Sequence, residues 1–124
     1  MRPLGTAFLL LLSALACFAQ TPTISEPPQN AASYAPAGLA NGSLAQGTMF
    51  VVKGNGFGPC NTNNTVIAST FPLQNTMRSV QIRVTVGGQT YNGKMIYVVV
   101  CRGNGPDQLA AILPSNVPVG SGTM

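Results

Sequence analysis

Residues 80–91, VQIRVTVGGQTY, constrain the fold of this chain more than any other stretch. Apolar residues alternate with polar ones from residue 80 to residue 86. A period of two predicts a β-strand with one buried face and one solvated face. Gly87-Gly88 then supplies the positive φ angles that a two-residue hairpin requires. The expected cross-strand pairs are Val86 with Gln89 and Val84 with Tyr91.

The rest of the chain also predicts short strands separated by turns. Strands are expected at residues 48–53, 94–100 and 109–113. The second of these strands is expected to be buried on both faces, because its apolar run does not alternate. No stretch after residue 20 keeps a 3.6-residue period, and ten prolines and fourteen glycines interrupt the 124 residues. The sequence therefore predicts one all-β domain, a sandwich or a barrel.

The N-terminus has the layout of a secretory signal peptide. Arg2 precedes an apolar run that ends in small residues near Ala19. The run is shorter than the roughly 20 residues that a membrane span needs. We expect cleavage after Ala19 and a secreted or cell-surface protein with no membrane span after removal of the signal. Cys17 leaves a lipoprotein as the alternative, although Ala14 stands where a lipobox carries a large aliphatic residue.

Removal of residues 1–19 leaves two of the three cysteines, Cys60 and Cys101. Paired cysteines in an exported chain usually form a disulfide. A catalytic thiol needs a base, and the chain contains no His. We therefore predict a bond between Cys60 and Cys101.

The mature chain divides into two parts by composition. Residues 20–33, QTPTISEPPQNAAS, lack periodicity and read as an extended leader or linker. The folded domain is expected to occupy residues 34–124.

Residues 54–58, GNGFG, follow an apolar strand and raise the question of a nucleotide site. A dinucleotide-binding loop needs a helix directly after its glycines, because the pyrophosphate lies at the N-terminus of that helix. Pro59, Cys60 and a loop rich in Asn and Thr follow instead. The glycines are therefore expected to serve a turn where the strand leaves its sheet.

Residues 47–59, GTMFVVKGNGFGP, resemble the opening strand and turn of immunoglobulin-like domains of the IPT/TIG type. Further segments resemble, in order, the Solibacter-type C-terminal domain of acidobacterial secreted proteins. The resemblance implies an exported, immunoglobulin-like β-sandwich module, and it brings no catalytic residues. The segments are NAASYAPAG (30–38), FPL (71–73), VQIRVTVGGQTY (80–91), MIYV (95–98) and LAAILPSNVPVGSGT (109–123).

The chain departs from the pattern of that family in two respects. The segments CNTNNTVIAST and CRGNGPD look like insertions, each holding one cysteine. The family also continues into a further strand after the segment that resembles residues 109–123. The resemblance therefore implies that residues 34–124 lack the last strand of the domain.

The side chains of the mature part offer little reactive chemistry. Its only acids are Glu26 and Asp107, which are far apart in sequence, whereas acid–base catalysis needs two positioned groups. We expect no enzyme, no cofactor and no metal site. A weak calcium site that joins Asp107 to the carbonyls of Asn61, Asn63 and Asn64 is the alternative to reading those residues as turn formers.

Composition leaves two functions open. The first is a non-catalytic structural, spacer or adhesion module, and the second is a glycan-binding module, so that the partner is an unidentified protein or a cell-surface glycan. Glycan sites use exposed aromatics, for which Tyr34 and Phe57 are the candidates, while the other aromatics are expected in the core. The net charge of +4 comes from scattered bases, whereas nucleic-acid binding needs them gathered on one face.

Overall fold

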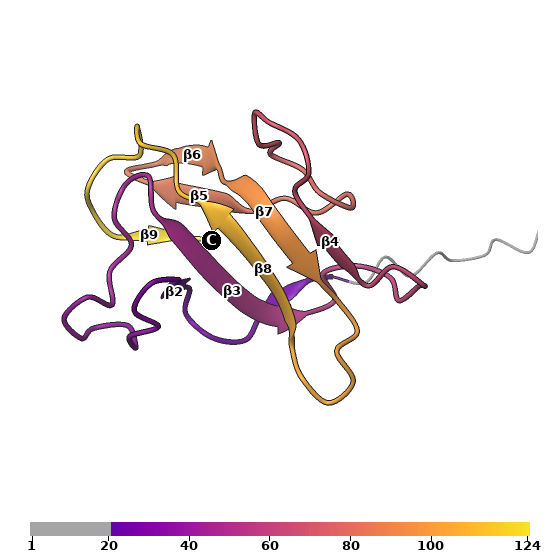
Figure 1. Cartoon of the computed structure of the whole chain (residues 1–124). Helices are drawn as coiled ribbons and strands as arrows, with labels where there is room; N and C mark the ends of the chain where they lie inside the picture. The colour runs from indigo at the N-terminus through magenta and orange to yellow at the C-terminus, as the bar shows by residue number, and fades with distance from the viewer. Residues whose placement is uncertain (1–20) are drawn as a thin grey trace, which may run out of the picture.

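A computed structural model describes residues 21–124 of the chain. Two antiparallel sheets pack face to face and form a β-sandwich, and the described residues contain no helix (Figure 1). Accordingly, no helix in residues 21–124 is long and apolar enough to cross a membrane. The expected signal peptide, residues 1–19, lies outside the described residues. The predicted all-β sandwich class is confirmed.

The larger sheet has six strands, in the order β1-β3-β8-β7-β4, with β2 also paired to β3. Its centre is formed by segments distant in sequence, because β3 pairs with β8 from Met49–Ile112 through to Gly54–Asp107. The strands are β1 (Thr23–Ile24), β2 (Gln29–Asn30), β3 (Met49–Asn55), β4 (Thr65–Ile67), β7 (Lys94–Val99) and β8 (Asp107–Ile112).

The smaller sheet has three strands, in the order β6-β5-β9. Strands β5 (Arg83–Val86) and β6 (Gln89–Asn92) form the predicted hairpin, in which Val86 pairs with Gln89 and Val84 with Tyr91. Gly87 and Gly88 take φ values of 60° and 79°, as the turn requires. Strand β9 (Gly122–Thr123) pairs with the other side of β5, over Thr85 and Val86 alone.

The core lies between the two sheets and follows the alternation of the strands. One face of each central strand points inward, so that Phe50 and Val52 of β3 meet the buried residues of β8 and β7 in register. Burial of each large apolar side chain contributes about 1.5–3 kcal/mol. The buried apolar residues of the core are Phe50, Val52, Phe57, Ile82, Val84, Val86, Met95, Val98, Val100, Leu109, Ala111, Leu113 and Val117.

The prediction for residues 94–100 needs a correction. Met95 and Val98 are fully buried, but Ile96, Tyr97 and Val99 of β7 are only partly buried. A β-bulge between Met95 and Tyr97 shifts the register against β8. A bulge inserts one extra residue, which interrupts the alternation of inward and outward side chains. The continuous apolar run therefore reflects the bulge and not burial on both faces.

Strands β1, β2, β4 and β9 have no counterpart among the expected elements. Strands β1 and β2 belong to residues 20–33, the expected leader, and both pair with β3. Strand β4 lies in the turn-rich stretch between residues 54 and 79 and pairs with β7. Each of these strands has only two or three residues, which is too short to display a period.

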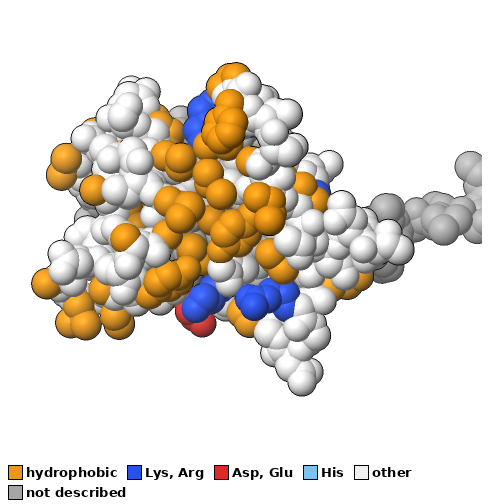
Figure 2. Space-filling view, viewed as in Figure 1, with side chains coloured by type: hydrophobic (Ala, Val, Ile, Leu, Met, Phe, Trp, Pro, Cys, Tyr) orange, Lys and Arg blue, Asp and Glu red, His pale blue; other side chains and the backbone are white. Residues whose placement is uncertain are grey.

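The outer face of the larger sheet is apolar at its middle (Figure 2). Val51, Ala110 and Tyr97 lie side by side in the registers of β3, β8 and β7. Val51 and Ala110 are almost completely buried on this face. Figure 2 shows charged side chains below the apolar middle and at the top of this face. Lys53 forms an ion pair with Glu26 of the leader at 3.4 Å.

Candidate functional site

The glycine run begins in the last residues of β3 and continues into a close-packed bend of the chain. A Cβ atom at Gly54 would lie 2.0 Å from the carbonyl oxygen of Thr23 and 2.7 Å from the ring of Phe57, so a side chain there would displace both neighbours. Gly56 has a φ of 74°, which favours glycine. The expected role in a turn holds for Gly56, whereas Gly54 lies within β3, where the close approach of Thr23 and Phe57 leaves no room for a side chain.

Phe57 corrects an expectation about exposed aromatics. Its side chain is only 5% exposed and belongs to the core. The ring packs over Gly54, because the turn at Gly56 folds the chain back toward β3. Phe57 is therefore not a surface candidate for binding a glycan.

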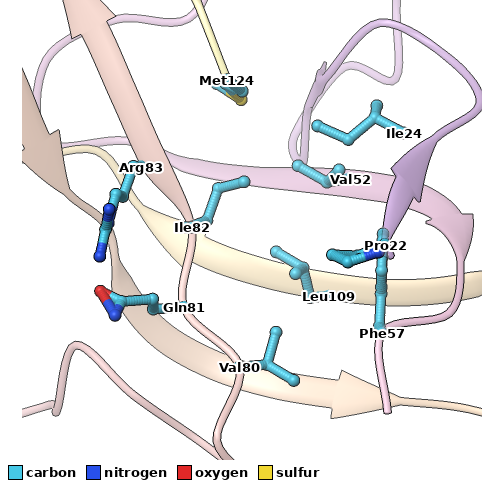
Figure 3. Close-up of a pocket in the computed structure, with 10 residues that line it drawn as sticks. All are labelled: Pro22, Ile24, Val52, Phe57, Val80, Gln81, Ile82, Arg83, Leu109 and Met124. Carbon is cyan, nitrogen blue, oxygen red and sulfur yellow. The ribbon is translucent and has the colours of Figure 1, made fainter. Parts of the chain in front are cut away.

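A cavity of about 440 Å³ opens between the two sheets beside Phe57. Figure 3 shows apolar side chains around it, among them Val52 and Leu109 of the larger sheet and Ile82, which directly precedes β5. Arg83 and Gln81 border the cavity, but their side chains point away from it (Figure 3). The cavity can therefore hold an apolar group.

Asp107 is the one acidic residue that the fold buries, and its side chain is 8% exposed. Oδ2 accepts a hydrogen bond from the Phe57 N–H at 2.9 Å, and Oδ1 accepts one from the Cys101 N–H at 2.9 Å. Both carboxylate oxygens thus bind backbone donors. Asp107 joins the loop after β3 to the loop before β8.

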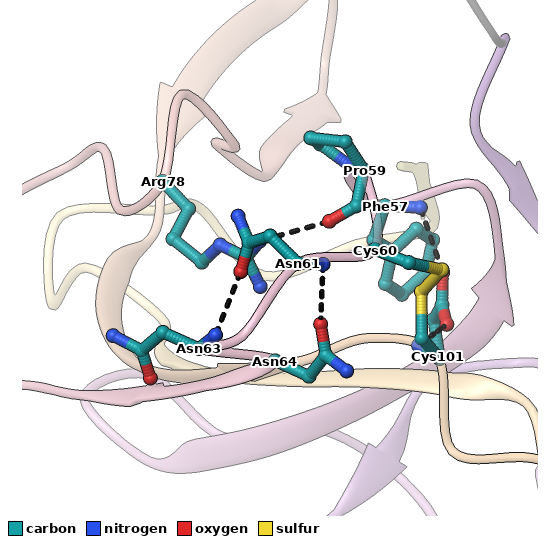
Figure 4. The surroundings of a disulfide bond; sticks show 9 residues. Phe57, Pro59, Cys60, Asn61, Asn63, Asn64, Arg78 and Cys101 are labelled. Carbon is teal, nitrogen blue, oxygen red and sulfur yellow. Dashed lines mark hydrogen bonds between the residues drawn. A yellow bond between two sulfur atoms is a disulfide. The ribbon is translucent and has the colours of Figure 1, made fainter.

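The predicted Cys60–Cys101 disulfide is present next to Asp107 (Figure 4). The Cα atoms are 5.7 Å apart, a separation that the bond spans without movement of the backbone. Cys101 has a φ of 55°, and its N–H is the donor that Asp107 accepts. The disulfide and the carboxylate therefore tie together the same two loops.

The asparagines of the Cys60 loop bind the backbone of their own loop. Asn61 Oδ1 accepts from the Asn63 N–H, and Asn64 Oδ1 accepts from the Asn61 N–H, both at 2.8 Å (Figure 4). The Arg78 guanidinium donates to the Pro59 carbonyl oxygen at 2.9 Å. The asparagines of the alternative calcium site therefore stabilise the turn of their own loop, and the positively charged Arg78 lies beside them. Within residues 21–124 no group of three or more His, Cys, Asp or Glu side chains could hold a metal ion.

Of the other expectations about aromatic residues, the one for Tyr34 is confirmed and the one for Phe71 is wrong. Tyr34 is 51% exposed, in agreement with its place as a surface candidate. Phe71 was expected in the core but is 84% exposed. It lies in the long loop between β4 and β5, which projects from the sandwich (Figure 1). Its apolar character alone could not locate it, because no periodic pattern surrounds it.

Comparison of the chain with protein-family models, with curated proteins and with solved structures finds no match.

Proposed function

We propose that this chain is a non-catalytic immunoglobulin-like module, which serves as a structural, spacer or adhesion part of an exported bacterial protein. The observation that carries the proposal is that the most reactive side chains of the described residues make structural contacts. Asp107 and the cysteine pair hold two loops together, and Glu26 pairs with Lys53 at the surface. In each case the reactive group serves the fold.

The immunoglobulin-like type is part of the proposal. The packing of two antiparallel sheets supports it, as does the resemblance of five segments to an exported family. The disulfide supports an oxidising compartment, because paired cysteines persist there.

A glycan-binding module is the second candidate. Tyr34 and Phe71 expose large parts of their rings, and exposed aromatic rings offer flat apolar surfaces to sugars. No other observation on the described residues favours a glycan over a protein partner.

A glycan array probed with the oxidised chain separates the two candidates. We expect no saturable signal for any glycan. The variants Tyr34→Ala and Phe71→Ala provide the comparison, and Leu39→Ala, which removes an exposed apolar residue that is not aromatic, is the matched control. Saturable binding that disappears in an aromatic variant but persists in the Leu39 variant would establish the glycan-binding function instead.

A further inference from the structure

Several asparagines of the chain are directly followed by a glycine. In such a pair the main-chain nitrogen of the glycine can attack the side-chain amide carbon of the asparagine, because both groups belong to one chain and no Cβ atom obstructs the approach. The attack needs a glycine N–H that is free and room for the chain to bend. The pairs are Asn41-Gly42, Asn55-Gly56, Asn92-Gly93 and Asn104-Gly105.

The fold protects two of the four pairs. The Gly42 N–H donates to the Leu39 carbonyl oxygen at 2.9 Å. The Gly93 N–H donates to the Ile82 carbonyl oxygen at 3.0 Å. Both glycines are buried, and a Cβ atom would lie 2.3 Å from the Pro36 oxygen at Gly42 and 2.6 Å from the neighbouring side chain at Gly93. Neither nitrogen can therefore reach the asparagine unless the surrounding structure opens.

The pair Asn55-Gly56 is held from both sides. The Gly56 N–H has no backbone acceptor in the described chain. However, Asn55 pairs with Thr23 at the end of β3, and the next residue, Phe57, donates its N–H to the Asp107 carboxylate at 2.9 Å. The peptide bond that has to rotate for the attack is thus fixed at each end.

The pair Asn104-Gly105 is free in every one of these respects. It lies in the loop between β7 and β8, which projects beyond the ends of the strands (Figure 1). Both residues are exposed, and the Gly105 N–H has no backbone acceptor in the described chain. A Cβ atom at Gly105 would come no closer to another atom than 3.8 Å, at Arg102 Cβ. The attacking nitrogen therefore has both its proton and the room to react.

We propose that Asn104 is a modification site at which the chain deamidates itself, with water as the co-reactant. The Gly105 nitrogen forms a bond to Asn104 Cγ and gives up its proton, the bond from Cγ to Nδ2 breaks, and ammonia leaves behind a succinimide ring. Water then opens the ring. Cleavage between the Gly105 nitrogen and Cγ yields aspartate, and cleavage between that nitrogen and the main-chain carbonyl carbon yields isoaspartate. The inference goes beyond the proposed function and does not depend on it.

The modification changes the loop that joins the disulfide to Asp107. The loop begins at Cys101, whose N–H the Asp107 carboxylate accepts. Arg102 is the only charged side chain between Cys101 and Asp107. Deamidation adds a carboxylate to this loop, and isoaspartate also lengthens its main chain by a methylene group. The charge and the length of the loop therefore change with time after synthesis, without any enzyme.

Incubation of the oxidised full chain followed by peptide mapping tests the proposal. After reduction of the disulfide, trypsin places each Asn-Gly pair in a different peptide. Mass spectrometry detects the replacement of NH₂ by OH, and electron-transfer fragmentation separates aspartate from isoaspartate. The reduced chain in guanidinium chloride gives the rate of each pair without the fold. The cleavages that separate the pairs follow Lys53, Arg78, Lys94 and Arg102.

We expect the folded chain to convert Asn104 at a rate within about threefold of its rate in guanidinium chloride. Asn41 and Asn92 should react at least about tenfold more slowly in the folded chain than in guanidinium chloride, because they must wait for local opening. Asn55 should react more slowly than Asn104, since its backbone is held on both sides.

Gly105→Ala tests the attack itself in a folded chain. The added Cβ atom fits at this position, but it obstructs the approach of the nitrogen, so conversion of Asn104 should fall at least about tenfold. Gly58→Ala is the matched control, because a Cβ atom there meets only Val100 Cγ1 at 3.6 Å, and it should leave the rate at Asn104 unchanged. Asn104→Asp supplies the reference peptide for the aspartate product.

Three results would overturn the proposal. The first is slowing of Asn104 by the fold as strong as that of Asn41 and Asn92. The second is faster conversion of Asn55 than of Asn104 in the folded chain. The third is an unchanged rate at Asn104 in the Gly105→Ala variant. The glycan array tests the proposed function separately, because none of these rates depends on a glycan.

Discussion

Asp107 shows how one residue can join parts of a sandwich that are far apart in sequence. Its carboxylate accepts N–H groups from Phe57 and Cys101, which lie 50 and 6 residues away. Hydrogen bonds to an ionised group are stronger than neutral ones, and a buried donor without a partner is costly. Asp107 therefore stabilises the fold by holding the two loops together.

Asp107→Asn should lower the free energy of unfolding by about 1–3 kcal/mol. The amide keeps one acceptor oxygen but turns an NH₂ group toward a backbone N–H. Urea denaturation followed by fluorescence or circular dichroism measures the change. Glu26→Gln is the matched control, because it alters the exposed ion pair with Lys53 and should cost less than about 1 kcal/mol. Equal effects of the two variants would contradict the role of Asp107.

Gly54→Ala should destabilise the protein by about 1–3 kcal/mol, because the added methyl group overpacks a site between Thr23 and Phe57. Gly58→Ala provides the control, since a Cβ atom there meets only Val100 Cγ1 at 3.6 Å. Thermal unfolding of the two variants makes the comparison. A Gly54 variant as stable as the Gly58 variant would show that β1 and Phe57 can move aside.

Among the elements, the β5–β6 hairpin depends on its two-residue turn. Gly87→Asn should be tolerated, because Asn-Gly is a favoured pair for positive φ at both positions. Gly87→Val should cost about 1–2 kcal/mol, since a branched side chain is strained at a φ of 60°. Chemical denaturation distinguishes the variants, and equal stability would mean that the turn adopts another conformation.

Elements with a clear local period could be predicted from the sequence. The β5–β6 register followed from the alternation up to Val86 and the glycine pair, and β3 and β8 were located within a few residues. The bulge in β7 could not be predicted, because an unbroken apolar run is the same for a bulge and for a strand buried on both faces.

Elements and contacts that depend on residues distant in sequence could not be predicted from the sequence. Strands β1, β2 and β4 are defined by pairing with β3 and β7 and have no pattern of their own. The burial of Phe57 depends on how the turn at Gly56 folds back. The role of Asp107 had one available signal in the sequence, namely an acid at the start of an apolar strand in a chain with almost no acids.

For the whole molecule, the disulfide is the one covalent link between distant parts of the described chain. Cys60 and Cys101 are 41 residues apart, and the chain-entropy model gives about 4 kcal/mol for a loop of that length. This is a large part of the roughly 5–15 kcal/mol that stabilises a typical domain.

The double variant Cys60→Ser/Cys101→Ser should therefore lose about 4 kcal/mol of unfolding free energy. Urea denaturation with and without a reductant measures the loss, and the reductant should have no effect on the variant. Cys17→Ser serves as the control, because Cys17 lies in the expected signal peptide. An equally stable double variant would show that Asp107 alone suffices to hold the two loops.

The export prediction concerns the N-terminus of the exported protein. Sequencing should find Gln20 first, since the signal is expected to be cleaved after Ala19. The variant Ala19→Arg should block cleavage, because the cleavage site requires a small residue. A product that begins at a lipid-modified Cys17 would favour the lipoprotein alternative.

The chain is synthesised and exported with its N-terminus first. The sandwich can form only after β8 has emerged, because β3 pairs with β8. The β5–β6 hairpin is local and can close within about 1–10 μs. Strand β3 has to wait until residues 107–112 have emerged, and folds dominated by such distant pairings form in milliseconds to seconds. During that delay the apolar segment MFVV remains without its central partner and Cys60 without Cys101. The nascent chain therefore passes through a period in which a chaperone and a thiol oxidant would act on it.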